Sequence, residues 1–176
     1  MTNKALAVAV VVLSAVTLTA QSKRPDFSGT WKLNELGSTA TGGGRGSGNG
    51  EGNSRGGGLG LGGSPDTIKV VQTAETLVIE ERRGTESARI TYSFDGKPVT
   101  NVVAAGRSSG ANATYTSTWK GDQLVTTIRI PPAPGGGELS TYQETRSLDR
   151  NGSLVVEITM TGRPNSRKLV YVKAKS

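Results

Sequence analysis

The residue types that carry out most enzyme chemistry are missing from this chain. It contains no His and no Cys, which removes the commonest general base near neutral pH, the imidazole and thiolate ligands of metals, and disulfides. Carboxylate, Lys, Tyr and Ser chemistry remains. Glu80 and Glu81 are adjacent in a β-rich run, so their side chains point to opposite faces and cannot form a close acid–base pair. We expect no catalytic site, no metal and no cofactor.

A second pair of opposite charge lies later in the chain. Glu144 and Arg146 are two residues apart in a β-rich run, so they share one face of a strand. This spacing is typical of ion pairs at a protein surface, which stabilise little. We therefore expect Glu144 and Arg146 to form a surface pair rather than a catalytic one.

The elements that would position such residues are short β-rich runs separated by turn signals. Asp95-Gly96 and Asn151-Gly152 are typical of tight hairpins, and connections this short join antiparallel neighbours. No window outside the first 20 residues shows a helical period. The expected strands number ten, at 28–36, 66–73, 76–82, 87–94, 98–104, 111–120, 123–130, 138–148, 153–161 and 167–174.

Alternation along these strands indicates one buried face. Ile90, Tyr92 and Phe94 share a face, and so do Tyr115 and Trp119. Residues 154, 156, 158 and 160 are all apolar and oppose Glu and Thr. An antiparallel meander of about ten strands exposes two edges unless it closes on itself. The sequence therefore predicts an all-β, up-and-down barrel.

The segments before and after the predicted first strand differ in composition from the rest of the chain. Residues 1–20 have the charge of Lys4, an apolar run at 5–16 and a small residue, Ala20, as in a signal peptide. We expect 21–176 to be one exported domain, periplasmic or extracellular. Residues 39–65 are Gly-rich and predict a flexible loop within it.

Two kinds of partner are disfavoured by composition. The Gly-rich segment holds a single Arg-Gly-Gly and no aromatic residue, whereas nucleic-acid-binding segments of this type repeat the motif with aromatics. A membrane barrel needs a continuous apolar outer band and aromatic girdles, but the predicted outer faces carry Lys, Arg and Asn. We expect no nucleic-acid partner and no stable membrane insertion.

The opening strand resembles a known superfamily. In PDFSGTWKLN, residues 25–34, the positions of Phe27, Gly29 and Trp31 are similar to the first strand of the calycins, the lipocalins and fatty-acid-binding proteins. The ten expected strands and the closing RKLVYVKAKS, residues 167–176, are similar to the fatty-acid-binding branch. The resemblance implies a barrel with Trp31 covering its floor and a ligand in its lumen. Members of the fatty-acid-binding branch are mostly cytosolic, so the expected signal peptide would make this chain an exported, bacterial-type member.

The same comparison also shows departures. That branch binds the ligand carboxylate with an Arg two residues before its final Tyr, and here Leu169 stands two before Tyr171. The Gly-rich segment stands where the branch has a helical lid. The resemblance therefore covers the topology and about ten residues, and it hardly extends to the ligand chemistry.

Two functions follow. The first is a carrier of an apolar small molecule, whose candidate lumen residues are Tyr92, Phe94, Tyr115, Trp119 and Tyr171; alternatively, these aromatics only fill the core. The second is an envelope module without a cavity. It would bind an anionic partner through a basic face, and the chain has net charge +7. The candidate basic residues are Arg163, Arg167, Lys168, Lys173 and Lys175.

Overall fold

The structure is a computed structural model, and it describes residues 24–41, 64–83, 86–103, 110–132, 138–163 and 166–175. The expected signal peptide, 1–20, and residues 42–63 of the expected loop lie outside these ranges. Every regular element in the described part is a β-strand. The strands are β1 Gly29–Leu33, β2 Thr39–Thr41, β3 Thr67–Gln72, β4 Thr76–Arg83, β5 Glu86–Ser93, β6 Pro98–Val102, β7 Asn112–Lys120, β8 Gln123–Ile130, β9 Ser140–Leu148, β10 Leu154–Met160 and β11 Ser166–Lys173. No helix in these ranges is long and apolar enough to cross a membrane.

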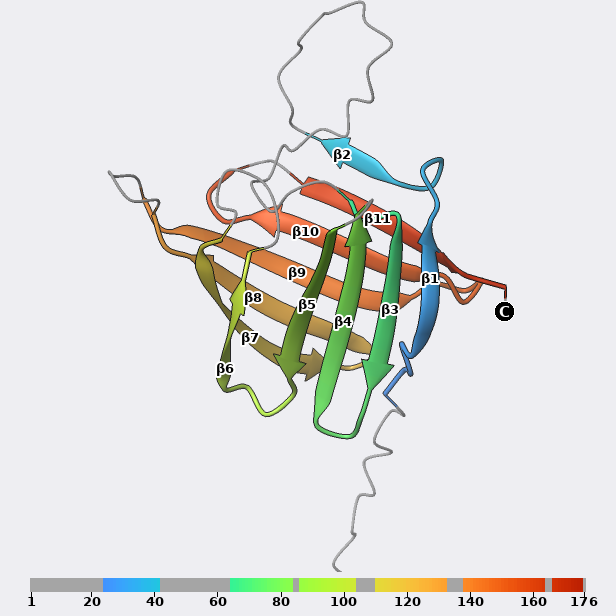
Figure 1. Cartoon of the computed structure of the whole chain (residues 1–176), viewed down its shortest axis with the longest axis horizontal. Helices are drawn as coiled ribbons and strands as arrows, with labels where there is room; N and C mark the ends of the chain where they lie inside the picture. The colour runs from blue at the N-terminus through green and yellow to red at the C-terminus, as the bar shows by residue number, and fades with distance from the viewer. Residues whose placement is uncertain are drawn as a thin grey trace, which may run out of the picture.

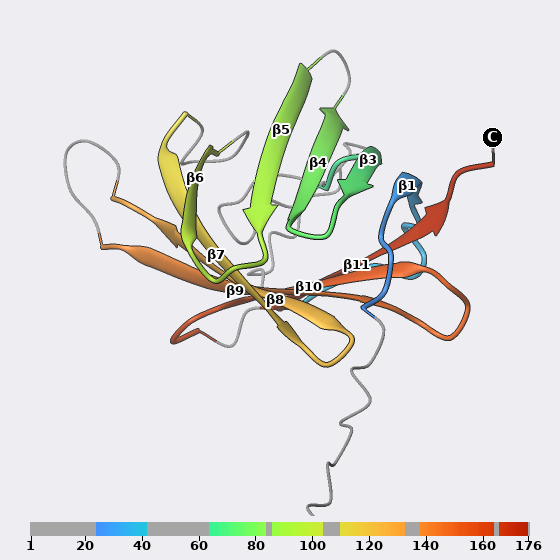
Figure 2. The ribbon, with the colours of Figure 1, turned by 90° about the horizontal axis from the view of Figure 1, so that it is seen from below.

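The strands form one antiparallel sheet that curls into a nearly closed barrel. Its order is β5-β4-β3-β1-β11-β10-β9-β8-β7-β6, so the first and last strands of the chain pair side by side. Figures 1 and 2 show β3, β4 and β5 crossing over β7 to β10, with the interior between the two halves. The all-β meander of ten strands predicted from the sequence is confirmed, and each strand lies within a few residues of its expected bounds.

One short strand was not expected. β1 ends at Leu33, and a turn at residues 35–37 leads into β2. The prediction that residues 39–41 belong to a loop was wrong, because they pair with Ser166–Lys168 of β11. Within β11, only the far end, at Tyr171–Lys173, pairs with β1. β2 thereby satisfies backbone groups at the start of β11 that β1 does not reach.

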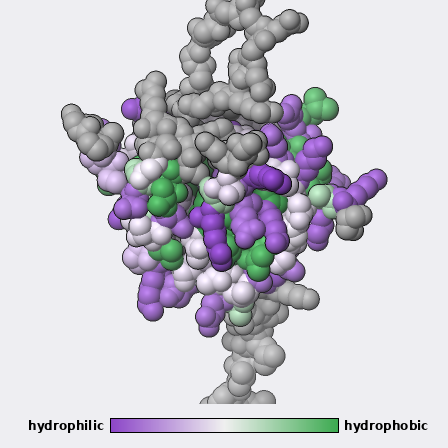
Figure 3. Space-filling view, viewed as in Figure 1, coloured by the Kyte–Doolittle hydropathy of each residue, from purple (hydrophilic) through white to green (hydrophobic). Residues whose placement is uncertain are grey.

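The interior is mainly apolar, as alternation predicted. In β7 every second residue, from Ala113 through Tyr115 to Ser117, is buried. The largest fully buried side chains are Phe27, Trp31, Tyr92 and Tyr171, with leucines and isoleucines between them. The outer face over β3 to β5 carries hydrophilic side chains among smaller hydrophobic patches (Figure 3). Lys69 and Glu80 pair across this face, with Nζ 3.9 Å from Oε2.

The barrel has one seam, between β5 and β6. The two strands are neighbours along the chain and in space, yet the sheet path ends at each of them. Asn101 of β6 bridges the seam, since its side-chain oxygen accepts from the Thr91 backbone N–H at 2.9 Å. Its Nδ2 donates to the Thr91 carbonyl at 2.8 Å. One amide side chain therefore reproduces a pair of ladder hydrogen bonds where no ladder forms.

Candidate ligand-binding pocket

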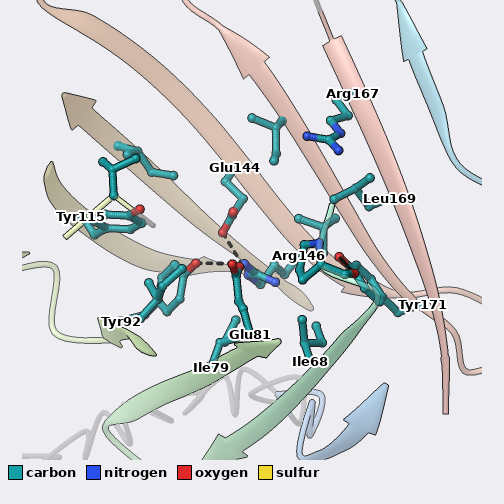
Figure 4. A pocket seen from close by; sticks show the side chains of 16 residues that line it. Ile68, Ile79, Glu81, Tyr92, Tyr115, Glu144, Arg146, Arg167, Leu169 and Tyr171 are labelled. Carbon is teal, nitrogen blue, oxygen red and sulfur yellow. Dashed lines mark hydrogen bonds and ion pairs between the residues drawn. The ribbon is translucent and has the colours of Figure 1, made fainter. Parts of the chain in front are cut away.

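A cavity of about 60 Å³ lies inside the barrel. Its apolar wall comes from β3, β4, β5, β7, β8, β10 and β11, through residues such as Ile68, Ile79, Ile128, Val156 and Leu169. Its polar lining comes from Glu81, Tyr92, Tyr115, Glu144, Arg146, Arg167 and Tyr171 (Figure 4). The expectation of a lumen lined by aromatic side chains was therefore incomplete, because four charged side chains also line the cavity.

Strand β9 brings Glu144 and Arg146 into the interior. Arg146 Nε donates to Glu144 Oε1 at 2.9 Å, and each side chain is only 6% exposed. Arg146 lies opposite Val156 of β10, and Glu144 lies opposite Ile158. The prediction of a surface ion pair was wrong. A buried pair of this kind depends on both partners, because either charge alone would be costly to bury.

The guanidinium of Arg146 also reaches across the barrel to β5. Its Nη2 donates to the Tyr92 hydroxyl at 2.9 Å, and its central carbon lies 5.1 Å from the centre of the Tyr92 ring. Burial by itself lowers the pKa of Arg146, but Glu144 and Tyr92 more than offset it, so this pKa is raised. Burial raises the pKa of Tyr92 well above its usual value, although Arg146 partly opposes the shift. The group is thus a charged guanidinium facing a protonated phenol.

Tyr115 of β7 completes the polar side of the cavity. Its ring packs edge-on against Tyr92 with centroids 5.5 Å apart, and the residue is 5% exposed. Burial, with the nearby carboxylates of Glu144 and Glu81, raises its pKa. Within the described ranges its hydroxyl makes no hydrogen bond to the protein. Figure 4 shows this hydroxyl directed toward the cavity centre.

The wall at β11 is completed by a segment outside the strands. Arg167 Nη2 donates to the Ser64 hydroxyl, and the Tyr171 hydroxyl donates to the Pro65 carbonyl at 3.4 Å. Pro65 is buried and lines the cavity. Arg167 was expected on a solvent-exposed basic face, and this was wrong: only 9% of it is exposed, and it lines the cavity.

The predicted lumen residues separate into two groups. Tyr92, Tyr115 and Tyr171 line the cavity. Phe94 and Trp119 do not; they form an aromatic cluster with Phe27 instead. Phe27 stacks on Trp119 with centroids 5.6 Å apart, and Phe94 meets Trp119 at 5.3 Å.

The Phe27-x-Gly29-x-Trp31 motif forms a compact structural unit. Trp31 is 1% exposed, and its indole N–H donates to the Phe27 carbonyl at 2.8 Å. Gly29 has φ 136°, and a Cβ there would lie 3.0 Å from Lys173 Cε. Lys173 Nζ in turn lies 5.6 Å from the Trp31 ring centre. The backbone conformation at this position therefore favours glycine, whereas the exposed Lys173 side chain could move away from a Cβ.

The other basic residues near the C-terminus are exposed. They are Arg163, Lys168, Lys173 and Lys175. Lys168 Nζ lies 3.9 Å from Glu157 Oε1, and Lys173 covers Trp31. With Arg167 turned inward, the predicted basic face therefore loses one of its five members.

The sequence contained a signal for the charged residues that the predictions placed outside. Glu144 and Arg146 alternate in phase with Tyr142 and Leu148, which face the core. Arg167 has the same phase as Leu169 and Tyr171. Period-two alternation by itself places all three side chains inside, whereas their charges favour the surface.

Comparisons with known proteins do not assign this chain to a family. No protein-family model matches the chain, and no curated protein matches it. Within the described residues, no group of three or more carboxylates is arranged to hold a metal ion. The fold, a nearly closed antiparallel barrel of ten strands, is compatible with a calycin-like architecture.

Proposed function

We propose that this chain is an exported, calycin-like protein that binds a small amphipathic molecule in its barrel. The observation that carries the proposal is the cavity in which Tyr92, Tyr115 and Arg146 converge from three strands. Apolar walls with a few convergent polar groups are the usual composition of ligand sites. Export is supported by the signal-peptide pattern of residues 1–20.

The size of the cavity limits what can enter. About 60 Å³ is room for roughly four to six water molecules, at about 10–15 Å³ each, or for the polar group of a ligand. A larger apolar part requires the lining to move. Two lining residues, Pro65 and Val103, belong to no strand. The backbone of Val103 is hydrogen-bonded to Ala111 and Gly110, so displacement of Pro65 costs the fewest backbone hydrogen bonds.

Native mass spectrometry of the protein purified from its own source without detergent tests this proposal. We expect a bound small-molecule mass that disappears on denaturation. Val156→Phe, which fills the cavity, should abolish it. Val172→Phe is the matched control, since Val172 lies on the same sheet but is 41% exposed and outside the cavity. An identical bound mass in both variants, or none in the unmodified chain, would contradict the proposal.

The alternative of a basic-face interaction module has less structural support. Arg167 lines the cavity and Lys168 is close to Glu157. The predicted basic face therefore has fewer cations available for an anionic partner than the sequence indicated. Its signature would be steeply salt-dependent binding to an anionic envelope component. We therefore favour the pocket.

A further inference from the structure

The cavity is balanced in charge before any ligand enters. Its lining contains two carboxylates, Glu81 and Glu144, and two guanidinium groups, Arg146 and Arg167. Arg146 is hydrogen-bonded to Glu144 at 2.9 Å in the interior. An incoming carboxylate would have to compete with Glu144 for this guanidinium and would leave Glu144 buried without its partner, which is costly. An incoming ammonium would displace Arg146 in the same way.

Unused hydrogen-bonding capacity in this cavity lies instead on two phenols. The Tyr92 hydroxyl accepts a hydrogen bond from Arg146, and its own proton has no acceptor among the described residues. The Tyr115 hydroxyl has no partner there either, although the residue is 95% buried. The Tyr115 oxygen is not among the fully buried side-chain atoms without a partner in the described residues, so it reaches the open space of the cavity, where a ligand can meet it. Both rings end at the cavity beside Glu144 and Arg146 (Figure 4).

We propose that the cavity selects an uncharged, oxygen-bearing head group, a hydroxyl or carbonyl, over a carboxylate or an ammonium. The oxygen of such a group accepts hydrogen bonds from the Tyr92 and Tyr115 hydroxyls and leaves the Glu144–Arg146 pair intact. The apolar remainder of the ligand packs on Ile79 and Ile128. This inference rests on the proposed function and names the ligand class of that same site.

Four probes with the same eight-carbon chain test the inference. They are octan-1-ol, octan-2-one, octanoate and octylammonium, titrated into the full chain at pH 7 by calorimetry. We expect the alcohol and the ketone to bind at least about tenfold more tightly than either ion, the factor that corresponds to about 1.4 kcal/mol. Octanoate binding as tightly as octan-1-ol would overturn the head-group inference and leave the proposed function standing.

A variant and its matched control test whether Tyr115 is responsible for the head-group selectivity. Tyr115→Phe should weaken octan-1-ol binding about tenfold, the upper range for one hydrogen bond, and leave octanoate unchanged. Tyr142→Phe is the control, because Tyr142 is also buried but does not line the cavity. Equal effects of the two variants would overturn the assignment of Tyr115. If Tyr115→Phe does not fold, the order of the four probes on the unmodified chain decides.

Failure of the two proposals gives different results. Absence of binding by all four probes, with a melting temperature unaffected by any of them, contradicts both the inference and the proposed function. In that case the cavity holds only water. Binding that persists in Val156→Phe would place the ligand outside the cavity, and this also overturns the inference.

Discussion

Asn101 and Thr91 close the barrel where its backbone does not. The amide of Asn101 exchanges two hydrogen bonds with the Thr91 backbone, at 2.9 and 2.8 Å, across the seam between β5 and β6. Asn101 is 7% exposed, so water does not readily replace it. Within the described ranges, both hydrogen bonds across this seam come from the Asn101 side chain.

Replacing Asn101 with Ala should open this seam. Two hydrogen bonds are lost, and we expect the free energy of unfolding to fall by about 1–3 kcal/mol. Amide exchange at Thr91 should accelerate at the same time. Asn112→Ala, at an exposed position of β7, is the control and should change stability little. Unchanged exchange at Thr91 in Asn101→Ala would show that the seam is held by other contacts.

The Glu144–Arg146 pair should behave as a buried ion pair in a double-mutant cycle. Arg146→Met leaves Glu144 buried without a counter-charge, and we expect a loss of about 3–5 kcal/mol. Adding Glu144→Gln removes the stranded charge, so the double variant should be more stable than Arg146→Met alone. Chemical denaturation of the four proteins measures the coupling. Additive losses would contradict the interior pairing seen here at 2.9 Å.

The buried phenols predict a loss of stability at alkaline pH. The pKa values of Tyr92 and Tyr115 are raised above 10.0 in the folded chain, chiefly by burial. The folded state therefore retains protons that the unfolded state releases. Their contribution is complete below about pH 10 and is lost as the pH rises toward the folded-state pKa values.

Denaturation at a series of pH values between about 8 and 11 measures this loss. The double variant Tyr92→Phe/Tyr115→Phe is the reference, because it lacks both phenols while other groups titrate as before. We expect the unmodified chain to lose more stability than the reference over this interval. In the folded protein, neither phenol should contribute phenolate absorbance at about pH 10.5. Parallel pH curves for the two proteins would contradict the prediction.

Replacing each of the two tryptophans with Phe should affect stability differently. The Trp31 indole N–H donates to the Phe27 carbonyl, whereas the buried Trp119 indole N–H has no partner among the described residues. Trp31→Phe loses a hydrogen bond and leaves a carbonyl unpaired, while Trp119→Phe removes an unsatisfied donor. We expect Trp31→Phe to cost at least about 1 kcal/mol more in unfolding free energy. A larger loss for Trp119→Phe would show that its aromatic contacts outweigh the difference in hydrogen bonding.

Much of the fold could be predicted because the responsible signals are local. Alternation in residues 87–94 and 153–161, and the turns at Asp95-Gly96 and Asn151-Gly152, act over a few residues and depend little on the rest of the chain. The strand order of the meander then follows from the short connections. β2 could not be predicted, because its pairing with Ser166–Lys168 joins segments more than a hundred residues apart.

The candidate site also combines features that the sequence predicts with features that it does not. The sequence determined which residues share a strand face, including Glu144 with Arg146 and Tyr115 with Trp119. The phase of Glu144 and Arg146 with Tyr142 also indicates the inward face. Only the tertiary structure decided that the interior accepts the charges of Glu144 and Arg146, that Tyr92 meets Arg146 from across the barrel, and that Trp119 packs on Phe27 outside the cavity. The physical reason is that a buried charge is tolerated only beside a suitable partner. Whether Arg146 has one depends on the closure of the barrel, which brings β5 and β9 together.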